Sequence, residues 1–232
     1  MAIAPLLSEQ QLQDLRQFST CTVANAIERF NVRLRNTGYT DGSLHCRFPG
    51  APPMVGYAVT ARLRSDGPPI AGNAFRDRTD FWNAILEIPA PRVLVLKDMD
   101  EVPGRGAFVG DVHAAILKAL GCVGYVTNGA VRELPGVREL DFQLFSGSLA
   151  VSHAYAHIFD VGAKLVVGGM DVHPGELVHG DQHGLLTIPS EIAAELPKVA
   201  AELQIQEEKV IEFCRSEKFS VAKLSQITRS VR

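Results

Sequence analysis

One segment, residues 104–134, constrains the fold of this chain more than any other part of its sequence (GRGAFVGDVHAAILKALGCVGYVTNGAVREL). It opens with a glycine-rich turn, and residues 112–120 then carry apolar side chains at the spacing of an amphipathic helix. Residues 122–127 are apolar enough for a buried strand, and Asn128-Gly129 predicts a turn at its end. A turn, a helix and a buried strand in this order are typical of an α/β fold.

The same segment predicts a binding site. A glycine turn that opens into a helix at Gly110 directs free backbone N–H groups and the positive end of the helix dipole to one point, which suits an anion. Arg132 adds a planar cation that matches a carboxylate. Asp111 and Glu133 add oxygen ligands for a divalent cation. The sequence therefore indicates a site for a small carboxylate beside a metal, with a plain surface ion pair of Arg132 and Glu133 as the alternative.

Composition excludes several classes of protein. The 232 residues are 46% hydrophobic and carry a net charge of −3, and no run of Lys or Arg suggests a nucleic-acid partner. No stretch of eighteen apolar residues predicts a membrane span. The N-terminal residues lack the pattern of a signal peptide. The four cysteines are scattered without a CxxC pair, so we expect reduced thiols in a cytoplasmic protein.

Periodicity predicts the elements of the first half of the chain. A helix is expected from Ser8, where Gln11 completes a capping-box pattern, and another from Ser19 or Thr20 to Phe30. The remaining predictions are strands at residues 54–63, 92–97 and 142–146, a helix at residues 73–86, a short turn or helix at residues 134–139, and a loop at residues 36–53.

The second half predicts a different organisation. Residues 151–188 hold four or more short strand signals separated by glycine turns, which indicates antiparallel hairpins. A helical tail follows at about residues 190–232, with a bend at Pro197. No linker divides the chain, so we expect one domain over residues 1–232. The mixed order of elements favours an α/β sandwich around a mixed sheet.

Common catalytic motifs are absent. The spacing of Gly104, Gly106 and Gly110 departs from the dinucleotide-binding pattern G-x-G-x-x-G, and no P-loop sequence is present. The Gly-x-Ser-x-Gly motif of hydrolases is also absent.

The histidines leave two readings open. His153 and His157 lie four residues apart, as zinc ligands on one face can do, although single structural histidines are the simpler interpretation. Further along the chain, six polar residues predict a rim that faces a neighbouring subunit's site: Asp171, His173, Glu176, His179, Asp181 and His183.

Three motifs resemble one known family. Asp111, twenty residues and Arg132-Glu133 follow the D-x20-R-D signature of the family that contains the regulator of ribonuclease activity A and the 4-hydroxy-4-methyl-2-oxoglutarate aldolases. STCTVANAI at residues 19–27 is similar to the family's opening motif. GGMDVHPGELVHGDQHGLLTIP at residues 168–189 resembles a later one. The likeness covers about residues 15–190.

The resemblance implies an α/β/β/α sandwich of the swivelling phosphohistidine-domain type, assembled as a homotrimer or homohexamer with sites between subunits. It implies a lyase that depends on Mg²⁺ or Mn²⁺ and cleaves a carbon–carbon bond of a pyruvate-derived oxo acid, such as 4-hydroxy-4-methyl-2-oxoglutarate or oxaloacetate. A non-catalytic regulatory protein is the alternative within the same family.

The resemblance also assigns roles to residues. The amides of Gly110, Asp111, Val112 and His113 and the side chain of Arg132 would hold the pyruvyl group. Asp111 would orient metal-bound water, and Glu133 would be the direct metal ligand. The family has Asp at the position of Glu133, so this carboxylate reaches one methylene further.

Overall fold

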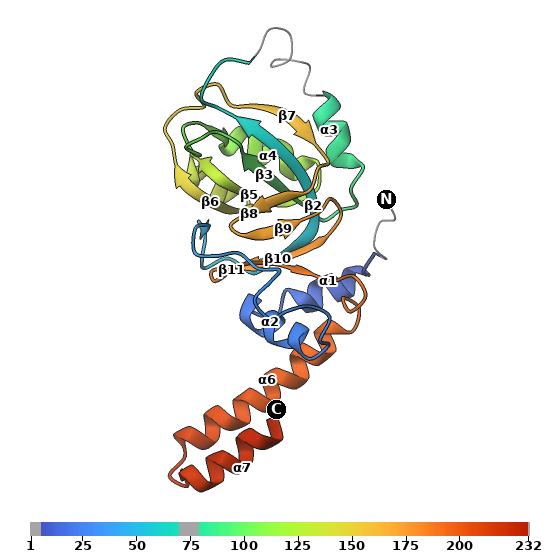
Figure 1. Cartoon of the computed structure of the whole chain (residues 1–232), viewed down its shortest axis with the longest axis vertical. Coiled ribbons are helices and arrows are strands. Elements are labelled where there is room, and N and C mark those ends of the chain that lie inside the picture. Colours follow the sequence, from blue (N-terminus) through green and yellow to red (C-terminus); the bar gives the residue numbers. More distant parts are fainter. Residues whose placement is uncertain (1–5, 70–78, 232) are drawn as a thin grey trace.

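The computed structural model describes residues 6–69 and 79–231 (Figure 1). The helices are α1 Glu9–Leu15, α2 Thr20–Glu28, α3 Thr79–Leu86, α4 Asp111–Ala119, α5 Leu134–Glu139, α6 Leu196–Arg215 and α7 Val221–Val231. The strands are β1 His45–Cys46, β2 Met54–Arg64, β3 Arg92–Asp98, β4 Ala107–Val109, β5 Cys122–Val131, β6 Gln143–Leu149, β7 His157–Val161, β8 Leu165–Val167, β9 Met170–Val172, β10 Leu177–Asp181 and β11 Gly184–Ile188.

A nine-stranded mixed sheet forms the centre of the molecule. Strands follow the order β1-β6-β5-β3-β2-β10-β11, while β4 pairs with β5 and β7 pairs with β2. Strands β2, β3, β5 and β6 run parallel to one another, whereas β10 and β11 form an antiparallel hairpin that pairs with β2 in the antiparallel sense. The sheet is strongly curved, and the small β8–β9 hairpin lies against it (Figure 1).

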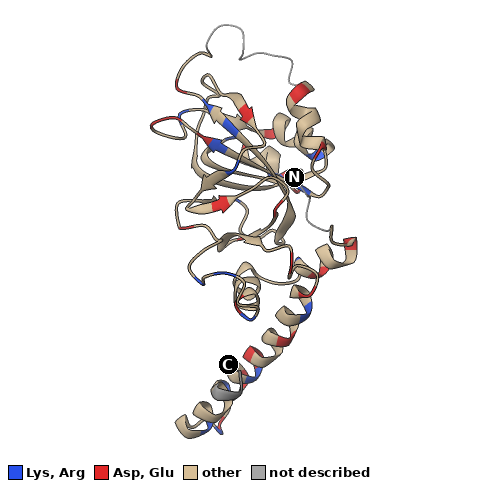
Figure 2. Ribbon diagram, turned by 45° about the vertical axis from the view of Figure 1, so that its right-hand side comes forward, with Lys and Arg blue, Asp and Glu red and all other residues tan. Residues whose placement is uncertain are grey.

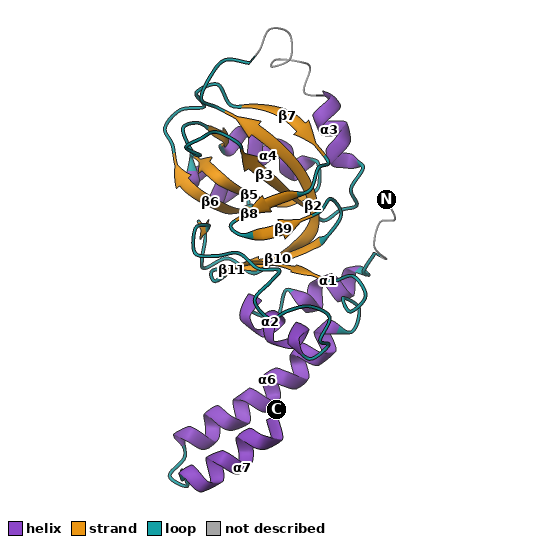
Figure 3. Ribbon diagram, viewed as in Figure 1, coloured by secondary structure: helices purple, strands orange, loops and turns teal. Residues whose placement is uncertain are grey.

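Three buried clusters separate four layers of structure (Figure 3). The first cluster packs α3, α4 and α5 on the parallel strands, and it includes Ile85, Leu117 and Val137. The second cluster packs parallel strands against β8, β9 and the β10–β11 hairpin, with Phe145 and Met170 fully buried. The third packs that hairpin under α1, α2 and the start of α6. The α/β/β/α sandwich expected from the sequence is thus confirmed.

Two predicted features are wrong in detail. Strand β5 does not end before Asn128-Gly129 but continues to Val131, because the pairing with β6 shifts register between Thr127 and Ala130 and absorbs the pair as an irregularity. Pro197 does not bend a helix. It lies in the first turn of α6, where a backbone N–H has no partner to lose.

The C-terminal tail forms a helical hairpin. Helix α6 starts against the third cluster and then projects away from the sheet, and α7 folds back beside it (Figure 1). Acidic and basic residues are interspersed along α6 (Figure 2). Among the described helices, none has both the length and the apolar composition needed to cross a bilayer. The predicted helix at residues 73–86 is seen from Thr79 on, and its earlier part lies outside the described residues.

Two of the motifs that resemble the family, residues 19–27 and residues 168–189, meet at the start of α2. Ser19 caps this helix through the Thr22 amide, as its sequence predicts. Asp181 at the end of β10 accepts a hydrogen bond from the Thr20 amide at 3.0 Å. His179 is fully buried, with its Nδ1 3.1 Å from the Thr20 hydroxyl oxygen and its Nε2 3.1 Å from the Leu15 carbonyl oxygen. These contacts bind the helical layer to the β10–β11 hairpin.

Replacing Asp181 by asparagine is expected to lower the free energy of unfolding by about 1–2 kcal/mol, because a charged cap of α2 is lost. Burial alone would raise the pKa of Asp181, but hydrogen bonds from the His183 and Thr20 backbones outweigh it and hold the pKa below its ordinary value of 3.8. The stabilisation is therefore present at neutral pH and is lost as the pH falls below 3.8.

Urea unfolding across this pH range measures the effect. Asp171→Asn serves as the matched control, because that carboxylate is 60% exposed and forms a surface ion pair with Lys164. An equal loss of stability in the two variants would contradict the capping role.

Candidate functional site

The predicted site residues come together where β4 and β5 end. Strand β4 pairs with β5 through Val109 and Val131, and the Arg132 amide donates a hydrogen bond to the Val109 carbonyl at 3.1 Å. The chain then enters α4 after Gly110 and α5 after Glu133. Two helix starts therefore lie side by side at the carboxyl ends of parallel strands, the edge where α/β folds place their ligands.

Arg132 and Glu133 form the charged centre of this site. An Nη2 hydrogen of Arg132 is donated to Oε1 of Glu133, and the Asp111 amide donates to Oε2 of the same carboxylate at 3.2 Å. The two side chains are 25% and 36% exposed. The Val112 amide donates to Oδ1 of Asp111 at 2.6 Å. The carboxylates of Glu133 and Asp111 thus accept hydrogen bonds from the Asp111 and Val112 amides, two of the N–H groups that the sequence predicts for a bound anion.

The backbone around Glu133 is shaped to hold this arrangement. Glu133 has φ of 56° and ψ of 39°, a left-handed conformation that is uncommon for a residue other than glycine. A Cβ at Gly110 would collide with Oε2 of Glu133, so a larger residue there would force the Glu133 carboxylate to move. A Cβ at Gly136 would come within 3.0 Å of the Asp111 side chain. Strained backbone of this kind collects at functional sites.

Glu133 stays ionised in this setting. The hydrogen bond from Arg132 and then the one from the Asp111 amide hold the pKa of Glu133 below its ordinary value. Because the carboxylate is charged at neutral and mildly acidic pH, it can act as an anionic ligand or as the counter-ion of Arg132.

A buried network that the sequence reasoning missed supports the glycine turn. Asp98 is 1% exposed and accepts hydrogen bonds from the Gly104 amide at 2.7 Å and the Asp100 amide at 3.0 Å. Asp100 accepts from the Ser65 hydroxyl at 2.7 Å, and Ser65 accepts from the Gly106 amide at 3.1 Å. The ends of β2 and β3 therefore fix the loop that leads to Gly110. The only sequence signal was the pair of aspartates after the β3 run.

The histidines near the site do not form a zinc centre. His113 stacks on Phe108 with ring centroids 4.8 Å apart, and the His153 ring lies 6.1 Å from the His113 ring. His153 and His157 each place Nδ1 2.7 Å from a backbone carbonyl oxygen, of Ala107 and Tyr155 respectively. Within residues 6–69 and 79–231, no group of three or more His, Cys, Asp or Glu is placed to hold a metal ion.

The donor set at this site nevertheless suits one class of cation. Asp111 and Glu133 present two neighbouring carboxylates, and Glu133 is ionised. Mg²⁺ commonly binds through one or two carboxylates and completes its shell with water and substrate oxygens. A soft metal that needs several His or Cys ligands does not fit these residues.

Comparison with known proteins places this arrangement in a family. A family model described as RraA-like, Aldolase/RraA, matches residues 20–187. The chain belongs to this family. The match spans both helix starts and the strand end that build the site, so the resemblance seen in the sequence is confirmed.

Three known proteins show how far the similarity extends. A Halalkalibacterium halodurans protein named "Putative 4-hydroxy-4-methyl-2-oxoglutarate aldolase" is 31% identical over 84 residues, 36% of this chain and 40% of the relative. The match thus spans about two fifths of that protein. An uncharacterized Pseudomonas syringae pv. tomato protein has a structure with a TM-score of 0.75, at 22% identity over 99% of this chain and 97% of its own. Streptomyces coelicolor RraAS2 is described as an unusual member of the RNase ES inhibitor RraA protein family. Its structure has a TM-score of 0.68, at 22% identity over 87% of this chain and 96% of its own.

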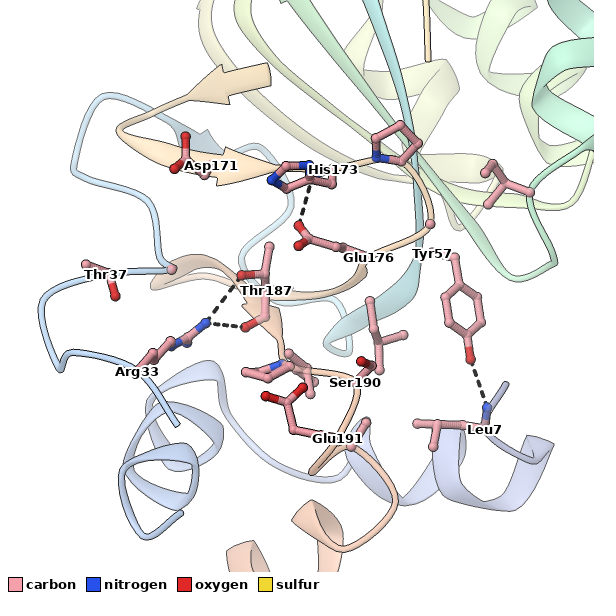
Figure 4. A pocket seen from close by; sticks show the side chains of 18 residues that line it. Leu7, Arg33, Thr37, Tyr57, Asp171, His173, Glu176, Thr187, Ser190 and Glu191 are labelled. Atoms are coloured by element: carbon pink, nitrogen blue, oxygen red, sulfur yellow. Dashed lines mark hydrogen bonds between the residues drawn. The ribbon is translucent and has the colours of Figure 1, made fainter. Parts of the chain in front are cut away.

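A large cavity lies elsewhere in the molecule. It has a volume of about 700 Å³ and is lined by Arg33, Asp171, His173 and Glu176 among others (Figure 4). Arg33 donates to the Thr187 carbonyl at 2.8 Å, and the Glu176 carboxylate accepts from the His173 amide at 2.9 Å. Several of its polar side chains thus already hold the surrounding loops together.

The predicted polar rim is therefore divided between two places. Asp171, His173 and Glu176 line this cavity, whereas His179 and Asp181 are buried against α2 and cannot face a neighbouring subunit. The prediction was wrong for the latter pair because His179 and Asp181, two residues apart, lie on the same face of β10, and α2 covers that face.

Proposed function

We propose that this protein is a divalent-metal-dependent lyase that cleaves a carbon–carbon bond of a pyruvate-derived oxo acid, such as 4-hydroxy-4-methyl-2-oxoglutarate or oxaloacetate. The observation that carries the proposal is the juxtaposition of the Arg132 guanidinium, the carboxylates of Asp111 and Glu133, and the start of α4. Family membership and the aldolase name of one relative support it.

Each group has a role that follows from its chemistry. Arg132 binds the substrate carboxylate through its planar N–H fork and places positive charge beside the keto oxygen. The amides at residues 110–113 supply further donors to the same group once the side-chain carboxylates turn away. Glu133 would hold Mg²⁺ or Mn²⁺ directly, and Asp111 would hold it through water. The cation supplies Lewis-acid stabilisation of the charge that develops when the bond breaks.

The direct test is pyruvate release from oxaloacetate by the purified protein with Mg²⁺ or Mn²⁺, against a blank of the same metal without protein. The proposal expects turnover above the blank and its loss on addition of EDTA. Turnover that EDTA leaves unchanged would contradict metal dependence. Absence of turnover with both oxaloacetate and 4-hydroxy-4-methyl-2-oxoglutarate would favour a non-catalytic role.

A regulatory role is the second candidate, and one observation favours it. Apolar side chains surround the site: Val112 is 68% exposed, Leu149 54% and Val151 96%. Leu149 pairs with Val131, the residue before Arg132. An apolar rim of this kind marks a protein contact. It suits the binding of a partner protein, and it equally suits a second copy of this chain that covers the site.

We expect a homotrimer or homohexamer in which this rim is covered. Val151→Glu places a charge in the rim and should shift the assembly toward monomer, as measured by light scattering at micromolar concentration. Leu34→Glu is the matched control, because Leu34 is 72% exposed but lies in a loop on a different part of the chain. A monomeric wild-type protein, or equal dissociation of both variants, would contradict the assignment of the interface.

A further inference from the structure

A second cavity opens at the N-terminal ends of the parallel strands, whereas the candidate site lies at their C-terminal ends. Its volume is about 320 Å³, and its lining includes Met54, Val123 and Gln143. These residues lie at the starts of β2, β5 and β6, whereas Arg132 follows the end of β5. Because the three strands run in the same direction, their starts and ends lie at opposite edges. The cavity is therefore separate from the proposed oxo-acid site.

The wall of this cavity is largely apolar. The apolar lining residues that are exposed or half-buried are Ala51, Pro52, Pro53 and Val123, while Phe142, Met54 and Phe48 are nearly fully buried, at 1%, 4% and 6% exposed. The Gln143 side chain is used by the backbone, since it donates to the Phe48 carbonyl at 3.2 Å and accepts from the Leu144 amide at 3.0 Å. A ligand that fills this space must present an apolar body.

Two cations without ion pairs line the same cavity. Arg16 donates one long hydrogen bond of 3.4 Å to the Val55 carbonyl, and the Arg138 guanidinium carbon lies 5.2 Å from the centre of the Phe48 ring. Among the described residues, neither arginine has a carboxylate oxygen within 4.0 Å, and this includes Asp141, the acidic residue of the lining. The guanidinium N–H groups are thus available to an anion.

We propose that this cavity binds a small organic monocarboxylate with an aromatic or branched aliphatic body. The carboxylate meets the guanidinium groups of Arg16 and Arg138, whose forks match its two oxygens. The body packs on Pro52, Pro53 and Val123, the apolar lining residues that are open to the cavity. A free phosphate would satisfy the cations but would leave the apolar wall uncovered, so the volume and the wall select against it. This inference does not depend on the proposed lyase activity.

Calorimetry with benzoate and 4-methylpentanoate as probes tests the proposal on the full chain. We expect a dissociation constant of about 1 mM or below, which is within reach of ligands with about nine heavy atoms. Benzamide, which has the same shape without the charge, should bind at least tenfold more weakly. Arg138→Gln and Arg16→Gln should each weaken benzoate binding at least fivefold.

Two controls locate the binding. Arg35→Gln removes an arginine that is 75% exposed and pairs with Glu28 on the surface, and it should leave benzoate binding unchanged. Arg132→Lys reports on the other site and should also leave it unchanged. The proposal would be overturned if benzoate showed no saturable binding, if benzamide bound equally well, or if only Arg132→Lys lost binding. None of these results depends on turnover of an oxo acid.

Discussion

Replacing Arg132 by lysine is expected to lower kcat/KM for oxaloacetate at least tenfold, which corresponds to about 1.4 kcal/mol of transition-state stabilisation. Lysine keeps the positive charge but loses the planar fork that binds a carboxylate through two parallel hydrogen bonds. It would also loosen the hold on Glu133, whose carboxylate accepts from the Arg132 guanidinium. Steady-state kinetics with saturating Mn²⁺ measures the change.

The control for this variant is Arg35→Lys. Arg35 pairs with Glu28 as Arg132 pairs with Glu133, but it lies on the exposed surface away from both strand ends. We expect its kcat/KM to equal that of the wild type. Unchanged kinetics in Arg132→Lys would move Arg132 from substrate binding to a structural ion pair.

Replacing Glu133 by glutamine is expected to weaken metal binding and to reduce lyase activity with it. The amide nearly preserves the shape of the side chain but removes the charge that a hard cation requires. The hydrogen bond from the Asp111 amide to the side-chain oxygen can persist, so folding should be retained. Circular dichroism and thermal unfolding check this retention before the metal is titrated.

Glu133→Asp restores the family's residue and is the more informative change. In this chain Oε2 of Glu133 accepts a hydrogen bond from the Asp111 amide at 3.2 Å, beside Gly110. A carboxylate one methylene shorter would lose that hydrogen bond. We therefore expect weaker metal binding than in the wild type. Tighter binding in Glu133→Asp would mean that the site only tolerates the longer side chain.

The parts of the fold that are local in sequence could be predicted from it. The capping box at Ser8 and Gln11 is present, because both partners lie within one helical turn. The convergence of Gly110, Asp111, Arg132 and Glu133 also follows from local order, since a turn, a helix and a strand that pairs with the preceding strand must bring their ends together. The roles of these residues remain proposals.

Features that depend on distant contacts could not be predicted. The network of Ser65, Asp98 and Asp100 joins the ends of two strands to the glycine turn, and no local pattern marks it. The sequence around His179, beside glycine turns, suggested a surface residue. In the structure α2, which lies about 160 residues earlier in the chain, covers it, and only tertiary packing brings the two together. The bulge at Asn128-Gly129 arises because Thr127 accepts a hydrogen bond from the Gly129 amide at 2.9 Å inside a paired strand.

The measurement that tests the central claim most directly is a calorimetric titration of Mn²⁺ into the wild-type protein, Glu133→Gln and Glu133→Asp. It reads metal binding at the proposed ligand without requiring the physiological substrate. The account predicts saturable binding by the wild type, weaker binding by the aspartate variant and the weakest binding by the glutamine variant. Equal affinities in all three proteins would remove Glu133 from any metal site and would contradict the proposed mechanism.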